Sequence, residues 1–309
     1  MTSPGLVYWR AAIEGRRDVD PAAAALMVAQ PRFAEACWTS VAFALRRYGR
    51  NPIMTRVAKD ISRLFYGYLV IYLDARDAIT LTAIRDICHE IGLASRGRAQ
   101  AILFHLRAIG YLKPDPHQTD RRSRRYVPSS EMQSALRQVI TDELRAFSVI
   151  EPEAGRAADR FDEPDFYKAF LLRFGEGIVD AMKIKPVRIV SLFAERNAGT
   201  LILCDIMASA ERRDVYPPRG PLKMSVTDLA QKFDVSRSHV FRLLRDAEKQ
   251  GLLKRNADEQ TGTLEEVLAR DIVEFQVISF MALAHCCQHA FEATSTEPQA
   301  DNASAAHGA

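Results

Sequence analysis

An internal repeat constrains the fold of this chain more than any other feature of its sequence. Ser95-Arg96 and Gly110 recur as Ser236-Arg237 and Gly251 at a constant offset of 141 residues, and the apolar positions between them recur as well. Earlier matches, at an offset of 132 to 134 residues, pair Pro31-x-Phe33 with Pro164-x-Phe166, Pro52 with Pro186, and residues 67–71 with residues 199–203. Ordered matches at a slowly drifting offset predict two related halves.

The bulk composition agrees with two helical lobes. At 309 residues the chain is longer than one core usually supports, and 48% of its residues are hydrophobic. Apolar residues recur with a period of 3.6 along most of the chain, and the alternating pattern of strands is nearly absent. We therefore expect an all-α protein with small β wings.

No segment has the pattern of a membrane span or a leader. The longest run without a formal charge, residues 275–291, is marginal in length for a span and contains Gln and His. The N-terminal residues lack a basic start followed by an apolar core, so we expect no signal peptide. Five scattered cysteines without CxxC spacing suit a reducing cytosol, and we expect a cytoplasmic, nucleoid-associated protein with no membrane partner.

Five segments follow from the repeat and its breaks. We expect a flexible N-terminus (1–30), a first half (31–150), an exposed charged linker (151–163, reaching to about Asp165), a second half (164–292) and a disordered tail (293–309). Long helices that form a shared core are expected near Pro52–Asp74, Ser130–Phe147, Pro186–Arg212 and Leu264–Phe291.

Each half contains two short helices joined by a tight turn. In the second half, residues 226–233 predict the first helix, Asp234-Val235 the turn, and Ser236 the N-cap of the next helix. That helix should bury its apolar stripe, namely Val240, Leu243, Leu244 and Ala247. In the first half, the helix with Ile84, Ile87 and Ile91 precedes the turn Gly92-Leu93-Ala94, the cap Ser95, and a helix from which Arg96, Arg98, Gln100 and Arg107 should project.

A basic run follows the first pair of helices. Asp120-Arg121-Arg122-Ser123-Arg124-Arg125 lies between Pro116 and Pro128, where a hairpin would fall. Arginines on a narrow protrusion can neutralise phosphates or enter a minor groove. The second helix of each pair suits insertion into a major groove, where Arg recognises guanine and Gln recognises adenine. An arginine run is otherwise a common feature of a solvated face.

These residues resemble the MarR family of winged helix-turn-helix transcription regulators. The likeness is carried by Asp120-Arg121-Arg122, by Tyr126-Val127 and by the helix start Ser129-Ser130. It implies two winged units, at 80–128 and 222–263, joined by long helices into an intrachain pseudo-dimer that acts as a monomer. The second half departs from the pattern, because residues 256–263 hold no arginine where the wing should be. An asymmetric DNA site is therefore expected.

The expected function is a sequence-specific regulator of transcription, acting as a repressor on double-stranded DNA. The residues expected to contact DNA are Ser95, Arg96, Arg98, Gln100, Arg121, Arg122, Arg124, Arg125, Ser236, Arg237, Ser238, His239 and Arg242. Two alternatives stay open: a plasmid replication initiator with tandem winged helices, and a scaffold whose winged helices hold a protein partner.

Other residue clusters have a chemical and a structural interpretation. The aromatics of residues 65–72, with Trp38 and Phe43, can line a cavity for a small effector between the lobes or simply pack in the core. His285, Cys286 and His289 share a helix face as metal ligands would, and Cys88 is a possible thiol sensor, but core packing is the default for both. No phosphate loop, paired carboxylate motif or nucleophile elbow appears, so we expect no enzyme, no cofactor and no metal site.

Overall fold

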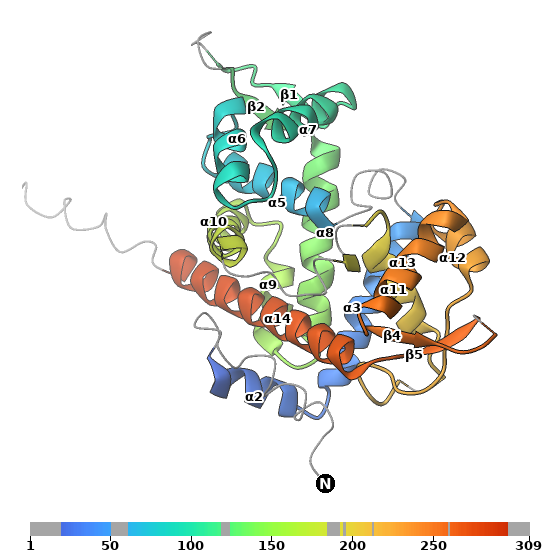
Figure 1. Cartoon of the computed structure of the whole chain (residues 1–309). Helices are drawn as coiled ribbons and strands as arrows, with labels where there is room; N and C mark the ends of the chain where they lie inside the picture. The colour runs from blue at the N-terminus through green and yellow to red at the C-terminus, as the bar shows by residue number, and fades with distance from the viewer. Residues whose placement is uncertain are drawn as a thin grey trace, which may run out of the picture.

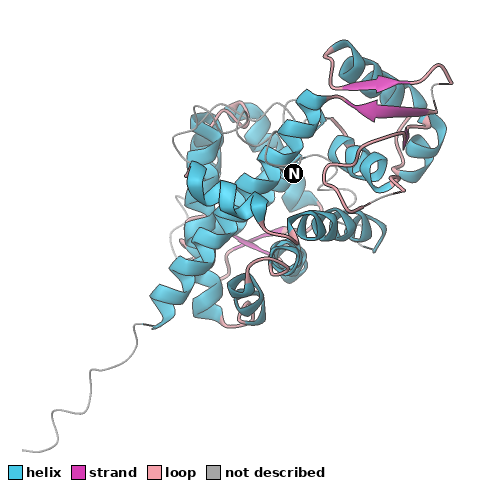
Figure 2. Ribbon diagram, turned by 90° about the horizontal axis from the view of Figure 1, so that it is seen from below, coloured by secondary structure: helices cyan, strands magenta, loops and turns pink. Residues whose placement is uncertain are grey.

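The computed structural model describes residues 20–50, 61–118, 124–183, 192–193, 196–211, 213–258 and 260–295. Within these ranges the chain forms twelve helices and five short strands, and the strands make two small antiparallel sheets. Figure 1 shows the helices making up nearly the whole molecule, and Figure 2 shows the strands gathered in separate places among them. The predicted mostly helical fold with small β elements is confirmed.

The helices are α2 (Pro21–Ala29), α3 (Phe33–Arg50), α5 (Ile61–Ala75), α6 (Leu81–Glu90), α7 (Arg96–Ala108), α8 (Ser130–Phe147), α9 (Pro152–Asp159), α10 (Pro164–Lys183), α11 (Gly199–Ala208), α12 (Val226–Lys232), α13 (Arg237–Lys249) and α14 (Glu266–Ser295). The strands are β1 (Leu112–Pro114), β2 (Tyr126–Pro128), β3 (Leu222–Lys223), β4 (Leu253–Arg255) and β5 (Thr261–Leu264).

The long helices pack in a reciprocal pattern. α3 contacts α8, and their counterparts α10 and α14 contact each other in the second half. Across the halves, α5 contacts α10 while α11 contacts α3. The repeat relates α5 to α11 and α3 to α10, so the two contacts across the halves are the same contact made in both directions. Figure 1 shows α8 standing in the middle, with α14 crossing below it.

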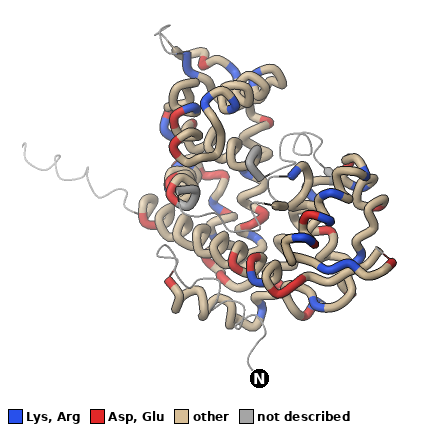
Figure 3. The backbone as a smooth tube through the Cα atoms, in the orientation of Figure 1, with Lys and Arg blue, Asp and Glu red and all other residues tan. Residues whose placement is uncertain are grey.

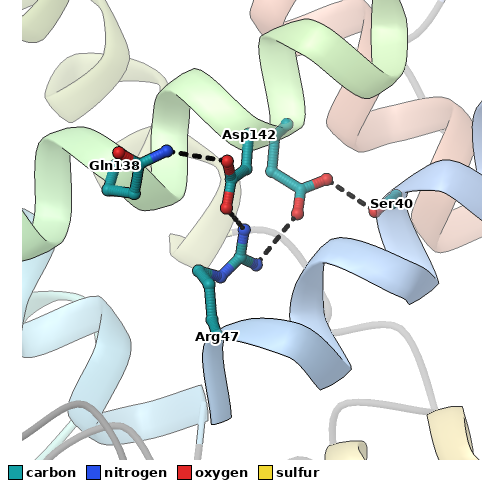
Figure 4. A network of polar contacts seen from close by, with 5 residues as sticks. Ser40, Arg47, Gln138 and Asp142 are labelled. Atoms are coloured by element: carbon teal, nitrogen blue, oxygen red, sulfur yellow. Dashed lines mark hydrogen bonds and ion pairs between the residues drawn. The ribbon is translucent and has the colours of Figure 1, made fainter. Parts of the chain in front are cut away.

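A polar network joins α3 to α8 (Figure 4). The Arg47 guanidinium donates to Asp142 Oδ2 at 2.8 Å and to Glu143 Oε1 at 3.2 Å, and the side chain of Arg47 is only 18% exposed. Ser40 Oγ donates to the other Glu143 oxygen at 2.6 Å, and Gln138 donates to Asp142 Oδ1 at 2.8 Å. Burial lowers the pKa of Arg47, but the neighbouring Glu143 and Asp142 outweigh it and the pKa is raised. This arginine therefore stays charged inside the helical core.

Two segments expected to be loose are packed helices. Residues 20–30 contain α2, capped by Asp20, with Ala24 and Val28 buried, while residues 1–19 lie outside the described ranges. The expected linker contains α9, in which Pro152 takes a first-turn position where its missing N–H costs nothing. Ala154, Ala157 and Ala158 of α9 are buried, and the helix contacts α8 and α14. The segment joining the halves is therefore part of the core and not an exposed linker.

The long helices agree with the predictions to different degrees. α8 has the predicted bounds, and α14 runs from Glu266 to Ser295, which leaves residues 296–309 outside the described ranges. α5 begins at Ile61, and residues 51–60 are not described. The single helix expected over Pro186–Arg212 is wrong, because Ala198 has a left-handed φ of 58° and α11 covers only Gly199–Ala208. A Cβ at Gly199 would lie 2.0 Å from the Phe193 carbonyl oxygen, so this turn requires glycine.

Candidate nucleic-acid interface

Two units of the molecule share one order of elements. The first unit, residues 80–128, runs through α6, α7, β1 and β2, and the second unit, residues 222–264, runs through β3, α12, α13, β4 and β5. In the second sheet β5 lies between β3 and β4. In the first unit a single antiparallel bridge between Thr80 and Arg125 replaces the edge strand β3. Each unit is therefore a pair of helices followed by a hairpin.

Both helix pairs are joined by the same kind of turn. Gly92 adopts a φ of 67° after α6, and Asp234 adopts a φ of 48° after α12. The turn after α12 is one residue shorter, and this explains why the repeat offset changes from 142 at the end of the first helix to 141 at the start of the second. Ser95 and Ser236 are the N-caps predicted from the sequence, since each Oγ accepts the backbone N–H three residues on, at 3.3 Å and 3.1 Å.

α13 presents a cationic outer face. Its predicted inner stripe is buried, and the residues exposed on its other side are Arg237, Ser238, Phe241, Arg242, Arg245 and Lys249. Arg242 Nε donates to the Ser238 carbonyl of its own helix, at 3.2 Å. Arg245 lies over the ring of Phe241, 5.8 Å from its centroid. These guanidinium groups can reach a ligand that approaches the helix from outside.

His239 lies differently from its predicted neighbours on α13. It is half-buried, and its Nε2 lies 2.8 Å from the carbonyl oxygen of Asn197, just before α11. The structure therefore places His239 in a contact between α13 and the core. The sequence contains no sign of this contact, because the two residues are 42 positions apart.

α7 presents a different face. Its exposed residues include Arg96 and Arg98 in the first turn and then Gly97, Ala101, Phe104 and Ala108 along one stripe. Arg96 lies 3.6 Å from Asp86 in an exposed pair. Two residues expected to project are half-buried: Gln100, and Arg107, whose guanidinium lies 5.1 Å from the centroid of Tyr126. Phe104 is 46% exposed. Helical periodicity already places Phe104 off the buried stripe, and that signal was available in the sequence.

The two hairpins differ in length and charge. The connection in the first unit spans residues 115–125, whereas that in the second spans residues 256–260. Arg124 and Arg125 are exposed, and the Arg125 N–H donates to Gln118 Oε1 at 2.7 Å. Asp120, Arg121 and Arg122 lie outside the described residues. Figure 3 shows Lys and Arg segments in both units.

In the second unit the hairpin arginine turns inward. The Arg255 side chain is 7% exposed and donates to Glu248 Oε2 through Nε at 3.0 Å and through a terminal nitrogen at 2.8 Å. The hydrogen bond from Arg255 lowers the pKa of Glu248. At the tip, the Asp258 carboxylate accepts the N–H groups of Gln260 and Thr261, which hold its pKa low. This hairpin therefore offers fewer cations than the first.

The remaining candidate groups lie in the core. Tyr66, Tyr68 and Tyr72 are buried, and Tyr68 packs edge-on against Phe174 at 5.0 Å, across the contact between the halves. Burial raises the pKa of Cys88 to about 11, so its thiol is not ionised at neutral pH. Among the described residues, no group of three or more His, Cys, Asp or Glu is placed to hold a metal ion.

Comparisons with known proteins add no relative. No helix in the described part of the chain combines the length and hydrophobicity needed to cross a bilayer. No family model, no curated protein and no solved structure matches this chain.

Proposed function

We propose that this chain is a sequence-specific regulator of transcription that binds duplex DNA through two winged helix-turn-helix units and represses by covering a promoter. The observation that carries the proposal is the repeated order of bridge or strand, helix, turn, helix and hairpin at residues 80–128 and 222–264. In both units the second helix is capped by a serine and exposes one whole side, as a helix that enters a major groove must.

The charge of α13 supports DNA as the ligand. Arg242 and Arg245 lie on the exposed side with Lys249 one turn further along, and within the described ranges no carboxylate forms an ion pair with any of the three. A guanidinium in a major groove can donate two hydrogen bonds to guanine O6 and N7. Arg124 and Arg125 of the first hairpin are exposed, and exposed arginines on a hairpin can neutralise phosphates or enter a minor groove.

The reciprocal packing supports a fused pseudo-dimer. Contacts of α5 with α10 and of α11 with α3 repeat one interface in both directions, which is the hallmark of a two-fold axis. Regulators of this class usually place two units on one operator through such an axis. Here a single chain would supply both units, and because they differ in sequence the operator would be asymmetric.

The test is selection of bound duplexes from a random library by the full chain, followed by gel-shift titration at several salt concentrations. Arg242→Ala with Arg245→Ala should weaken binding to the selected duplex at least tenfold, since each good base contact is worth about 1–3 kcal/mol. Each phosphate contact that is lost should reduce the salt slope by about 0.9. Arg121→Ala with Arg122→Ala should also weaken binding severely.

The matched control removes two exposed arginines that belong to neither unit. Arg32, just before α3, pairs with Glu35 in the first turn of that helix, and Arg156 pairs with Glu153 on α9, both on the surface. Arg32→Ala with Arg156→Ala removes the same charge and should leave the affinity within about twofold. Failure to enrich any duplex, or equal weakening by the two double variants, would refute the proposed function.

A further inference from the structure

The outer faces of the two second helices occupy equivalent positions but have opposite chemistry. At the repeat offset of 141 residues, Gly97, Ala101, Phe104 and Ala108 of α7 correspond to Ser238, Arg242, Arg245 and Lys249 of α13. All eight are exposed. The sequence places the basic hairpin in the first unit alone. At these equivalent helix positions the distribution of charge differs, with cations on α13 and apolar groups on α7.

Phe104 is the group that calls for an explanation. It is a large apolar side chain, 46% exposed, at the centre of the outer face of α7. With the exposed Ala101 and Ala108 about one turn to either side, the ring forms part of a contiguous apolar stripe, and a contiguous apolar surface indicates a contact with a partner. The ring has Arg107 beside it, 5.9 Å from its centroid, and Arg96 and Arg98 expose their side chains in the first turn of the same helix.

The surroundings of Phe104 favour nucleic acid over a protein partner. An apolar spot among arginines, next to a basic hairpin, is complementary to a surface that is anionic at its edges and apolar within. The major groove of A·T-rich DNA is such a surface, because phosphates line it and each thymine projects a C5-methyl group into it. Alanine and phenylalanine are among the side chains that contact this methyl group.

We propose that α7 recognises thymine methyl groups through Phe104, with Ala101 one turn before it, while α13 recognises guanine through Arg242 and Arg245. The inference rests on the proposed function and specifies its ligand. The binding site is then a composite of a thymine-rich half under the first unit and a guanine-containing half under the second. Without long side chains at positions 97, 101 and 108, α7 can approach the base edges closely enough for the ring to reach the methyl groups.

The experiment uses the full chain and the selected duplex, in which deoxyuridine replaces thymidine one half at a time. This change removes only the methyl groups. The half-site bound by α13 is identified first. It is the half in which replacing guanine weakens binding of the wild-type chain but no longer weakens binding of the Arg242→Ala, Arg245→Ala variant. In the other half, we expect each contacted methyl that is removed to weaken binding about fourfold, the value of one buried methyl group.

Two phenylalanine variants make the test specific. Phe104→Ala should weaken binding to the thymidine duplex and abolish the deoxyuridine effect, so the two losses should not add. Phe241→Ala is the matched control, since Phe241 is 39% exposed on α13 and should leave the deoxyuridine effect unchanged. Far-ultraviolet circular dichroism and the urea midpoint confirm that both variants fold.

The outcomes separate this inference from the proposed function. Tight binding that depends on Arg242 and Arg245 but ignores deoxyuridine, or a selected half-site without thymine, overturns the role of Phe104 and leaves the regulator intact. A deoxyuridine effect that persists in Phe104→Ala also overturns it. If no duplex is enriched, both proposals fail, and the exposed ring then belongs to a contact with another protein.

Discussion

Arg255 and Glu248 show how a single pair decides what the second hairpin can do. Arg255 ends β4, next to the connection of the second hairpin, but its side chain is directed onto Glu248 and is 7% exposed. Glu248→Gln should destabilise the protein by about 2 kcal/mol, because it removes the charge of the carboxylate to which the Arg255 Nε and a terminal nitrogen donate. Urea unfolding at pH 7 measures this. Glu153→Gln, in an exposed pair with Arg156, is the control and should change stability by less than about 0.5 kcal/mol.

The same pair predicts a pH dependence. The pKa of Glu248 is lower in the folded protein than its ordinary value of 4.5, chiefly through the hydrogen bond from Arg255. A carboxyl with a lowered folded pKa stabilises the native state above its unfolded pKa, and this stabilisation is lost as the pH falls through the folded pKa. Wild type should therefore lose more stability than Glu248→Gln between pH 6 and the acid limit of folding, in parallel urea titrations. Equal losses would contradict the assignment.

Arg47 is the residue on which the polar network between α3 and α8 depends. Arg47→Met leaves Asp142 and Glu143, which are 13% and 24% exposed, adjacent and without their cation. We expect a loss of about 3 kcal/mol in the free energy of unfolding. Adding Asp142→Asn and Glu143→Gln to Arg47→Met should recover part of it, because the network then holds no uncompensated charge. A loss below about 1 kcal/mol, or no recovery, would show that the network contributes little.

At the scale of elements, the sequence predicted what depends on local pattern. The bounds of α8, the two serine caps and the buried stripe of α13 follow from periodicity and capping chemistry, which act within a few residues. The sequence could not predict that α9 is a packed helix, because its buried face consists of alanines, which give only a weak apolar pattern. The face is buried through contacts with α8 and α14, which lie elsewhere in the sequence. The left-handed Ala198 and the contact of His239 with Asn197 were equally hidden, since each depends on chain brought together from elsewhere.

Substitutions at two glycines of α10 test the contact between α5 and α10. A Cβ at Gly175 would lie 2.1 Å from the Tyr72 ring, whereas one at Gly177 would meet no atom within 4 Å. Gly175→Ala should cost about 1–3 kcal/mol by forcing α5 and α10 apart. Gly177→Ala should be neutral or stabilise by up to about 1 kcal/mol through helix propensity. Thermal unfolding of both variants gives the comparison, and a stabilising Gly175→Ala would refute the close packing.

In the whole molecule, each two-helix unit is a direct continuation of the core. Ser129 begins α8 straight after β2, and its N–H donates to the Tyr111 carbonyl at 2.7 Å. The second unit joins α14 in the same way, since the Glu265 N–H donates to the Leu252 carbonyl at 3.0 Å. Tyr48 of α3 also donates to the Phe233 carbonyl of the second unit at 2.7 Å. The core helices therefore determine how far apart α7 and α13 stand.

If the halves are fused protomers, the covalent link between them is dispensable once both are present. The faces of α5 and α10, and of α3 and α11, are each covered by the other half, so either half alone would expose apolar surface. Residues 1–150 and 151–309, expressed together with a tag on one, should co-purify in a one-to-one ratio, and each expressed alone should aggregate or unfold without a cooperative transition. The intact chain should scatter light as a monomer of 34.7 kDa. Two fragments that fold separately, or an intact chain that is an obligate dimer, would mean that the reciprocal contacts do not replace a subunit interface.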